Sequence, residues 1–217
     1  MTMTARTDTH DMIVVHRVFR REFAMAPRLI RAVPAGDVTR ARVVAEHMRD
    51  IYAGLHGHHT SEDELLWPLL LARVDLDADK VLLMEAQHQR VDALLSRALS
   101  LLPEWEAAAA PDVRDTLADV YDALWPVLLE HLAAEESEVL PLVAEHVTQD
   151  EWNRLGERFE HETPKSKLML FLGALLEEAT PAEAALMLGK LPAPARLIWR
   201  LVGRRAYARR IRVVRGA

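Results

Sequence analysis

Apolar side chains recur at helical spacing through most of the chain, and strand-like alternation is absent over any useful length. The first apolar stripe includes Ile13, Val18, Phe19 and Phe23, and it predicts a helix over about 9–33. Glycine is scarce while alanine, leucine, arginine and glutamate are abundant, which favours helix throughout. The pattern therefore predicts an all-α protein.

Three more long helices are expected after the first one. They are predicted over about 37–72, 80–102 and 112–146, with polar or irregular connections at 75–79 and 103–111. Four long helices with short connections are expected to pack as an up-down-up-down bundle. We assign this bundle to residues 1–147.

The remaining residues, 148–217, predict an appended helical extension. Thr148 and Glu151 are spaced as in a capping box, which marks the start of a shorter helix. Four prolines between residues 164 and 194 divide the rest into short helices. The extension is thus predicted to add no further long helix to the bundle.

A polar motif occurs twice, 73 residues apart. The first copy is His58-x-x-x-Glu62 and the second is His131-x-x-x-Glu135; each has another acid directly after the glutamate and a proline ten residues after the histidine. A lone histidine precedes each copy, His16 and His88, and these are 72 residues apart. Positions i and i+4 share one face of a helix, so each copy presents an imidazole and a carboxylate together.

A single pair of this kind is weak evidence for a metal site. Five of the ten histidines have Asp or Glu four residues on, and many such pairs are solvated surface contacts. The repetition favours a shared function. Burying four imidazoles and two carboxylates without partners is costly, and a pair of metal ions removes that cost.

The order His, His-x-x-x-Glu, His, His-x-x-x-Glu resembles the hemerythrin-like family, also called the HHE cation-binding domain, over roughly residues 9–147. That resemblance implies a four-helix bundle around a non-haem di-iron centre with carboxylate and oxo or hydroxo bridges. By position, the implied ligands are His16, His58, His88, His131, Glu62 and Glu135. The first two histidines would bind one iron, the other two the second, and both glutamates would bridge.

The resemblance is incomplete on the third helix. Oxygen-carrying hemerythrins have a further histidine four residues after the one on that helix, and here the position is Asp92. Asp92 and His59 are therefore additional candidate ligands, although the 100° offset of His59 from His58 weakens its case. Four histidines instead of five favour redox chemistry or sensing over simple reversible oxygen carriage.

The donor types restrict the metal. Imidazole and carboxylate without sulfur suit iron, manganese or zinc, and a carboxylate-bridged pair favours iron, with manganese or zinc less favoured. A ferritin-like di-iron bundle would need two Glu-x-x-His motifs. The chain has one, Glu85-x-x-His88, which disfavours that alternative.

The expected function is a non-haem di-iron protein that binds or reacts with oxygen, peroxide or nitric oxide. One alternative is a di-iron enzyme with catalase-like or peroxidase-like activity. Another is an iron-buffering regulatory module that acts through its C-terminal tail. The same ligands serve all three functions, so the motif does not choose between them.

Composition narrows the setting. The chain has no cysteine, which excludes disulfides, thiolate metal sites and cysteine nucleophiles. No apolar run approaches the roughly 18 residues that a membrane span needs, and the N-terminus has no signal-peptide core. A cytoplasmic protein is therefore expected.

Charge is distributed unevenly along the chain. Residues 184–217 carry nine basic side chains and no acidic one, so the rest of the chain has a net charge of −15 within the total of −6. This complementarity favours docking of the basic tail on the acidic bundle of the same chain or of a partner subunit. Contact with an anionic membrane or nucleic acid is the alternative, although no nucleic-acid-binding module is recognisable.

Overall fold

The computed structural model describes residues 6–74 and 78–216, and every regular element within them is a helix or a helical turn. The chain divides into two compact units, Met1–Glu162 and Thr163–Ala217. The connection predicted at 75–79 lies partly outside the described residues. Within them, no helix is both long and apolar enough to cross a membrane.

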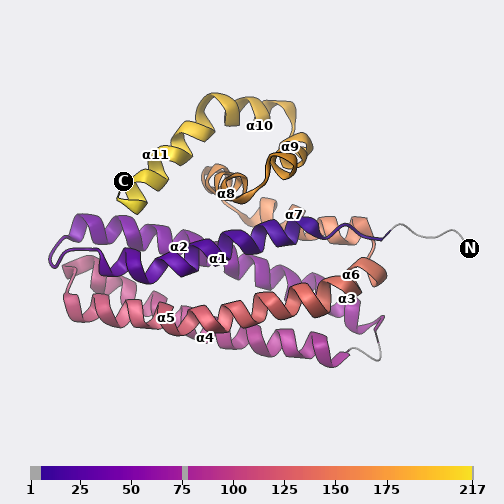
Figure 1. The fold of residues 1–217 in the computed structure, drawn as a ribbon, viewed down its shortest axis with the longest axis horizontal. Helices are drawn as coiled ribbons and strands as arrows, with labels where there is room; N and C mark the ends of the chain where they lie inside the picture. The colour runs from indigo at the N-terminus through magenta and orange to yellow at the C-terminus, as the bar shows by residue number, and fades with distance from the viewer. Residues whose placement is uncertain (1–5, 75–77, 217) are drawn as a thin grey trace, which may run out of the picture. The chain divides into compact units, whose positions relative to one another are not determined.

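Four long helical rods lie side by side in the first unit (Figure 1). Each rod contacts two neighbours, so the four close a ring in chain order. The rods consist of α1 (His10–Arg31); α2 (Val38–Ser61), η1 (Glu62–Leu66) and α3 (Trp67–Leu71); α4 (Ala78–Ala108); and α5 (Pro111–Ala134), η3 (Glu135–Val139) and α6 (Leu140–His146). The predicted all-α fold with a four-helix bundle is confirmed.

Local chemistry sets the turn between the first two rods and the length of the third. Gly36 has φ of 78°, a left-handed conformation that glycine adopts without a steric penalty. Asp37 then caps α2 by accepting a hydrogen bond from the Arg40 N–H at 2.9 Å. The predicted helix end before Pro103 was wrong. The third rod continues past this proline because Trp105, fully buried, extends its apolar stripe.

Both rods that carry a His-x-x-x-Glu motif contain a π-helical turn that begins at the glutamate. η1 starts at Glu62 and η3 at Glu135, and each ends one residue before the X-Pro pair that contains Pro68 or Pro141. Proline has no N–H and interrupts the α-helical hydrogen-bond ladder, and a single wide turn accommodates the break. These turns are the structural form of the bends that the prolines predict.

The first unit extends beyond the predicted bundle, because another helix packs on it. α7 (Gln149–Glu162) places Trp152 and Leu155 in an apolar cluster at one end of the rods. The Trp152 indole N–H also donates to Asp11 of α1 at 3.0 Å. In the structure this helix thus belongs to the same compact unit as the bundle, whereas the sequence predicts that it is part of the extension.

The second unit is built from short helices. They are α8 (Lys165–Glu178), α9 (Pro181–Lys190), α10 (Ala193–Ile198), the π-helical turn η4 (Trp199–Gly203) and α11 (Arg204–Arg215). Glu177 joins the first and last of them by accepting hydrogen bonds from the Tyr207 hydroxyl at 2.5 Å and from Arg215 at 2.6 Å. Gly173 permits this contact, since a Cβ there would lie 2.3 Å from the Tyr207 ring. These contacts give the unit a packed interior of its own.

Candidate metal centre

Seven side chains from all four rods meet inside the first unit. They are His16, His58, His59, Glu62, His88, His131 and Glu135. Six of them are at most 2 % exposed, and the His58 side chain is 9 % exposed. The structure therefore brings together all six side chains that the sequence ranked highest as ligands, and it adds one of the two weaker candidates.

The first group of donors consists of His16, His58 and Glu135. The Nε2 atoms of the two histidines are 3.3 Å apart, and Nε2 of His16 lies 3.2 Å from Oε2 of Glu135. One ligand atom from each residue falls within 4.8 Å of the other two. This group joins α1 and α2 to the end of α5, where η3 begins.

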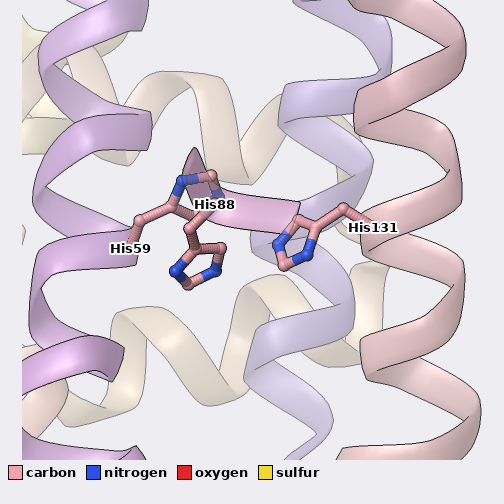
Figure 2. Close-up of side chains that lie close together, drawn as sticks. All are labelled: His59, His88 and His131. Atoms are coloured by element: carbon pink, nitrogen blue, oxygen red, sulfur yellow. The ribbon is translucent and has the colours of Figure 1, made fainter. Parts of the chain in front are cut away.

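The second group consists of His59, His88 and His131, whose donor atoms also lie within 4.8 Å of one another. Figure 2 shows the three imidazoles gathered between the helices. The His59 ring stacks on His88 with centroids 4.0 Å apart, and both rings meet the edge of His131 at 4.9 and 4.7 Å. This group joins α2, α4 and α5.

The two buried glutamates link these groups. Glu62 directs Oε1 toward Nε2 of His58 at 3.3 Å and Oε2 toward Nε2 of His88 at 3.5 Å. Oε2 of Glu135 lies 3.2 Å from His16 and 3.8 Å from His131. Each carboxylate thus faces one histidine of each group.

His59 enters the site because α2 faces two sides of the bundle at once. Adjacent residues of a helix point about 100° apart. His58 is turned toward α1, where its ring also contacts Phe19 at 5.3 Å, and His59 is turned toward α4 and α5. Reasoning from one helix face alone undervalues His59. Its adjacency to a motif histidine was the signal for it.

Asp92, the other weaker candidate, lies in neither group. It lines a surface pocket of about 270 Å³ together with Asp63, Glu85, Gln89 and His88. Burial raises the pKa of the Asp92 carboxyl above its ordinary value. His88 thus belongs both to the donor cluster and to the lining of this pocket.

Two further carboxylates hold histidines of the cluster from outside. Asp63 accepts a hydrogen bond from Nδ1 of His88 at 2.7 Å, and Glu136 accepts one from Nδ1 of His16 at 2.8 Å. A neutral histidine that donates through Nδ1 keeps the lone pair of Nε2, the atom that faces the cluster. The spacing of the motif predicts no role for either acid, because the partner of a ring nitrogen depends on how the helices pack.

These outer carboxylates are themselves supported by neighbouring side chains. Trp67 donates its indole N–H to Asp63 at 2.9 Å, and Arg20 donates to Glu136 at 2.6 Å. Support of this kind fixes the orientation of a ligand and tunes its basicity. The third ring, His131, has its Nδ1 3.3 Å from the Gln87 amide oxygen.

Burial governs the protonation of most of the imidazoles. It lowers the pKa of His58 and His59 well below 6.5 and that of His131 to about 4. These three rings are therefore neutral at pH 7, the form that binds a metal. His16 differs: burial acts to lower its pKa, but the Glu135 and Glu136 carboxylates together outweigh burial and raise it.

The pKa values of the two glutamates are shifted in opposite directions in the metal-free chain. Burial raises the pKa of Glu62 well above 4.5, and the nearby Glu135 raises it further. For Glu135 burial acts in the same sense, but attraction to His16, with smaller contributions from His58 and His131, outweighs it and holds the pKa at about 2. A metal ion at this site would bind Glu62 as a carboxylate and would therefore compete with a proton there.

Many of the buried donor atoms have no hydrogen-bond partner among the described residues, and their separations suit a bound cation. Buried atoms of five of these side chains lack a hydrogen-bond partner within the described residues, namely both oxygens of Glu62 and of Glu135, both ring nitrogens of His59, and Nε2 of His88 and His131. Two ligand atoms that are each about 2.1 Å from one ion lie about 3.0–3.4 Å apart. The closest donor separations here, 3.2–3.5 Å, agree with that spacing.

The family model of the hemerythrin HHE cation binding domain matches residues 7–143. The match covers more than half of the chain and contains all seven side chains of the cluster. The protein therefore belongs to the hemerythrin HHE cation-binding family, and its buried histidines and glutamates are consistent with a metal site.

The relatives carry no functional description. Uncharacterised proteins from Mycobacterium bovis and Mycobacterium tuberculosis are each 29 % identical over 159 residues, which cover 72 % of this chain and 61 % of theirs. The chain thus spans less than two thirds of the length of these curated relatives. No solved structure matches the chain.

Proposed function

We propose that the cluster holds a pair of iron ions and that the protein uses them to bind or react with oxygen, peroxide or nitric oxide. The observation that carries the proposal is the position of Glu62. Its two oxygens face His58 of one donor group and His88 of the other at 3.3 and 3.5 Å. A single ion would use one of these groups and leave the other buried without a partner.

The donor chemistry supports iron over the other metals. All donors are imidazole nitrogens or carboxylate oxygens, and the chain contains no cysteine. Structural zinc sites are mostly closed by four protein ligands, often with sulfur, whereas a carboxylate-linked pair of ions is typical of iron and manganese in helical bundles. Manganese is the nearest competitor.

The two groups supply unequal numbers of imidazoles. His59, His88 and His131 offer three to one ion, whereas His16 and His58 offer two to the other. The side with two imidazoles has more room for an exogenous ligand. We therefore expect small molecules to bind on the His16–His58 side.

Bound iron would supply redox chemistry and open coordination positions for a small diatomic or peroxide ligand. The chain's own part is to bury the donors, to exclude bulk water and to keep the outer nitrogens of His16 and His88 bonded to Glu136 and Asp63. These features favour a defined, reproducible ligand arrangement.

Metal analysis and an optical spectrum of the purified protein test the proposal. We expect about two iron ions per chain, with visible absorption in the oxidised state that changes on addition of oxygen, peroxide or nitric oxide. Glu62→Ala should lose the paired ions. One redox-inactive zinc per chain in wild type would contradict the proposal.

Stoichiometric oxygen evolution from peroxide separates the catalytic alternative from binding. An enzyme of the catalase class would turn over many equivalents of peroxide, whereas a sensor or carrier would show a spectral change without sustained turnover. Both results require the iron pair. Comparing these two results therefore identifies the reaction, whereas it does not identify the metal.

A further inference from the structure

The second unit exposes a compact apolar surface that its own packing does not explain. Leu197, Ile198, Leu201 and Val202 are 55, 52, 59 and 62 % exposed. They lie within six consecutive residues at the end of α10 and in η4. We call these four side chains the aliphatic patch. Large aliphatic side chains gathered in this way commonly mark a binding surface.

The patch lies on the opposite side of its helix from the part that packs inward. Trp199 is 7 % exposed, and a Cβ on Gly203, four residues later, would lie 3.3 Å from the sulfur of Met169 in α8. Residues four apart share a helix face. Leu197 with Leu201, and Ile198 with Val202, therefore form a separate face that points away from the interior of this unit.

Arginines border the aliphatic patch. Arg196, Arg200, Arg204 and Arg205 are all exposed and stand directly before, within or after it. No acidic residue follows Glu183 in the sequence. An aliphatic face flanked by arginine on a helix is the pattern of a segment that lies in the headgroup region of a bilayer with anionic lipids.

We propose that the aliphatic patch and its flanking arginines bind the surface of a membrane that contains anionic lipids. The aliphatic side chains would enter the boundary between headgroups and acyl chains, while the guanidinium groups would contact lipid phosphates. The C-terminal unit would then attach the protein to a membrane surface, and this role is independent of the metal centre.

A nucleic acid fits the same surface less well. Single-stranded nucleic acids are bound by basic grooves with exposed aromatic rings on which bases stack. The two aromatic side chains of η4 and α11 do not form such a surface: Trp199 is buried, and the Tyr207 hydroxyl is bonded to Glu177. Exposed leucine, isoleucine and valine gain little from a phosphate backbone, whereas they gain directly from lipid.

Flotation of the full-length protein with vesicles tests the proposal. One set of vesicles is phosphatidylcholine alone, and the other is phosphatidylcholine and phosphatidylglycerol in equal parts. We expect binding to the anionic vesicles, weaker binding as salt is raised, and little binding to the neutral ones. Binding equal on both vesicle types, or absent from both, would overturn the proposal.

A matched pair of double variants identifies the surface. Leu201→Asp with Val202→Asp should weaken binding to anionic vesicles by on the order of tenfold or more, because the aliphatic contact is lost and the two carboxylates offset part of the arginines' positive charge. Leu82→Asp with Leu83→Asp makes the same chemical change at two leucines of α4 that are each 50 % exposed, and it should leave binding unchanged. Equal effects of the two pairs would reject the patch.

A third variant keeps the test decisive if the aspartates disturb folding. Arg200→Gln with Arg204→Gln leaves the aliphatic patch intact and should still weaken binding to phosphatidylglycerol vesicles.

Three other results would assign the surface to a different partner. The patch would bind a second copy of the chain if wild type does not bind vesicles but self-associates with rising concentration, and if Leu201→Asp with Val202→Asp abolishes that association. A lowered melting temperature of the metal-loaded bundle in that variant, again without vesicle binding, would assign it to docking on the bundle. Salt-sensitive DNA binding unaffected by the aspartates would assign the arginines to nucleic acid. Each of these results overturns the proposal.

Discussion

Asp63 and Glu136 stand at matching places, each one residue after a buried glutamate, and each accepts a hydrogen bond from the lone histidine of the other motif copy. Asp63 accepts the hydrogen bond of His88, and Glu136 accepts that of His16. The duplicated motif is thus cross-connected: each copy supplies the carboxylate that orients the other copy's lone histidine.

We expect Asp63→Asn and Glu136→Gln to weaken metal binding by about 10- to 100-fold each, because a neutral amide fixes the ring less strongly and lowers its basicity. Competition against a chelator measures this change. Glu138→Gln, at an η3 carboxylate that is 53 % exposed, serves as the control and should leave affinity unchanged. Wild-type affinity in both test variants would show that the two hydrogen bonds have no influence on the metal.

His59→Ala should remove or weaken one of the two ions, since it takes one of three imidazoles from its group. His56→Ala is the matched control, because His56 is exposed and stacks on Tyr52 with ring centroids 5.6 Å apart. Metal stoichiometry by elemental analysis distinguishes them. If both variants keep the wild-type stoichiometry and affinity, His59 is a packing residue and not a ligand.

Removing the metal should lower the melting temperature. The cluster would then keep carboxylates and imidazoles in the core without a counter-ion, and binding at a free concentration 100-fold above Kd adds about 2.7 kcal/mol. For a protein of this size that corresponds to roughly 5–10 °C. Calorimetry with and without chelator measures the shift. Glu62→Ala with Glu135→Ala should show no such dependence, and equal melting temperatures for wild type would contradict a buried site.

A second buried pair predicts a pH effect away from the metal. Glu22 and His47 are each 1 % exposed and lie 2.8 Å apart. Burial acts to raise the pKa of Glu22, but His47 and then Arg21 outweigh it and lower the pKa below 4.5. A lowered carboxyl pKa stabilises the fold above about pH 4.5, and this stability is lost as pH falls through the folded-state pKa.

Glu22→Gln should therefore lower the stability of the metal-free protein by about 1–3 kcal/mol at pH 7. Its difference from wild type should narrow below about pH 4.5. Denaturant titrations between pH 7 and 3 give this comparison, with Glu138→Gln as the exposed control. A difference that stays constant across that range would mean that Glu22 contributes through packing and not through its charge.

The bundle could be predicted because its causes are local. Helical apolar stripes, a capping Asp37 and short connections determine which segments are helices and how many long rods they form. The end of the third rod was misjudged because Pro103 was read as a stop. Tertiary burial of Trp105 prevailed over the local penalty of a proline.

The centre was only partly accessible from the sequence. Spacing grouped His58 with Glu62 and His131 with Glu135, since i and i+4 share a face. The place of His59 required knowing that α2 touches neighbours on two sides, which spacing within one helix does not encode. The hydrogen bonds of Asp63 and Glu136 likewise depend on the packing of separate helices.

The two hydrogen bonds between motif copies, His88–Asp63 and His16–Glu136, differ in the length of chain between their partners. His88 and Asp63 are 25 residues apart in sequence, so their contact needs only the second and third rods. His16 and Glu136 are 120 residues apart, so their contact cannot form before the last rod has packed against the first. Closing a long loop is slower than closing a short one. The contact between His88 and Asp63 is therefore able to form while the protein is still being synthesised, whereas the contact between His16 and Glu136, and both complete donor groups, need the last rod.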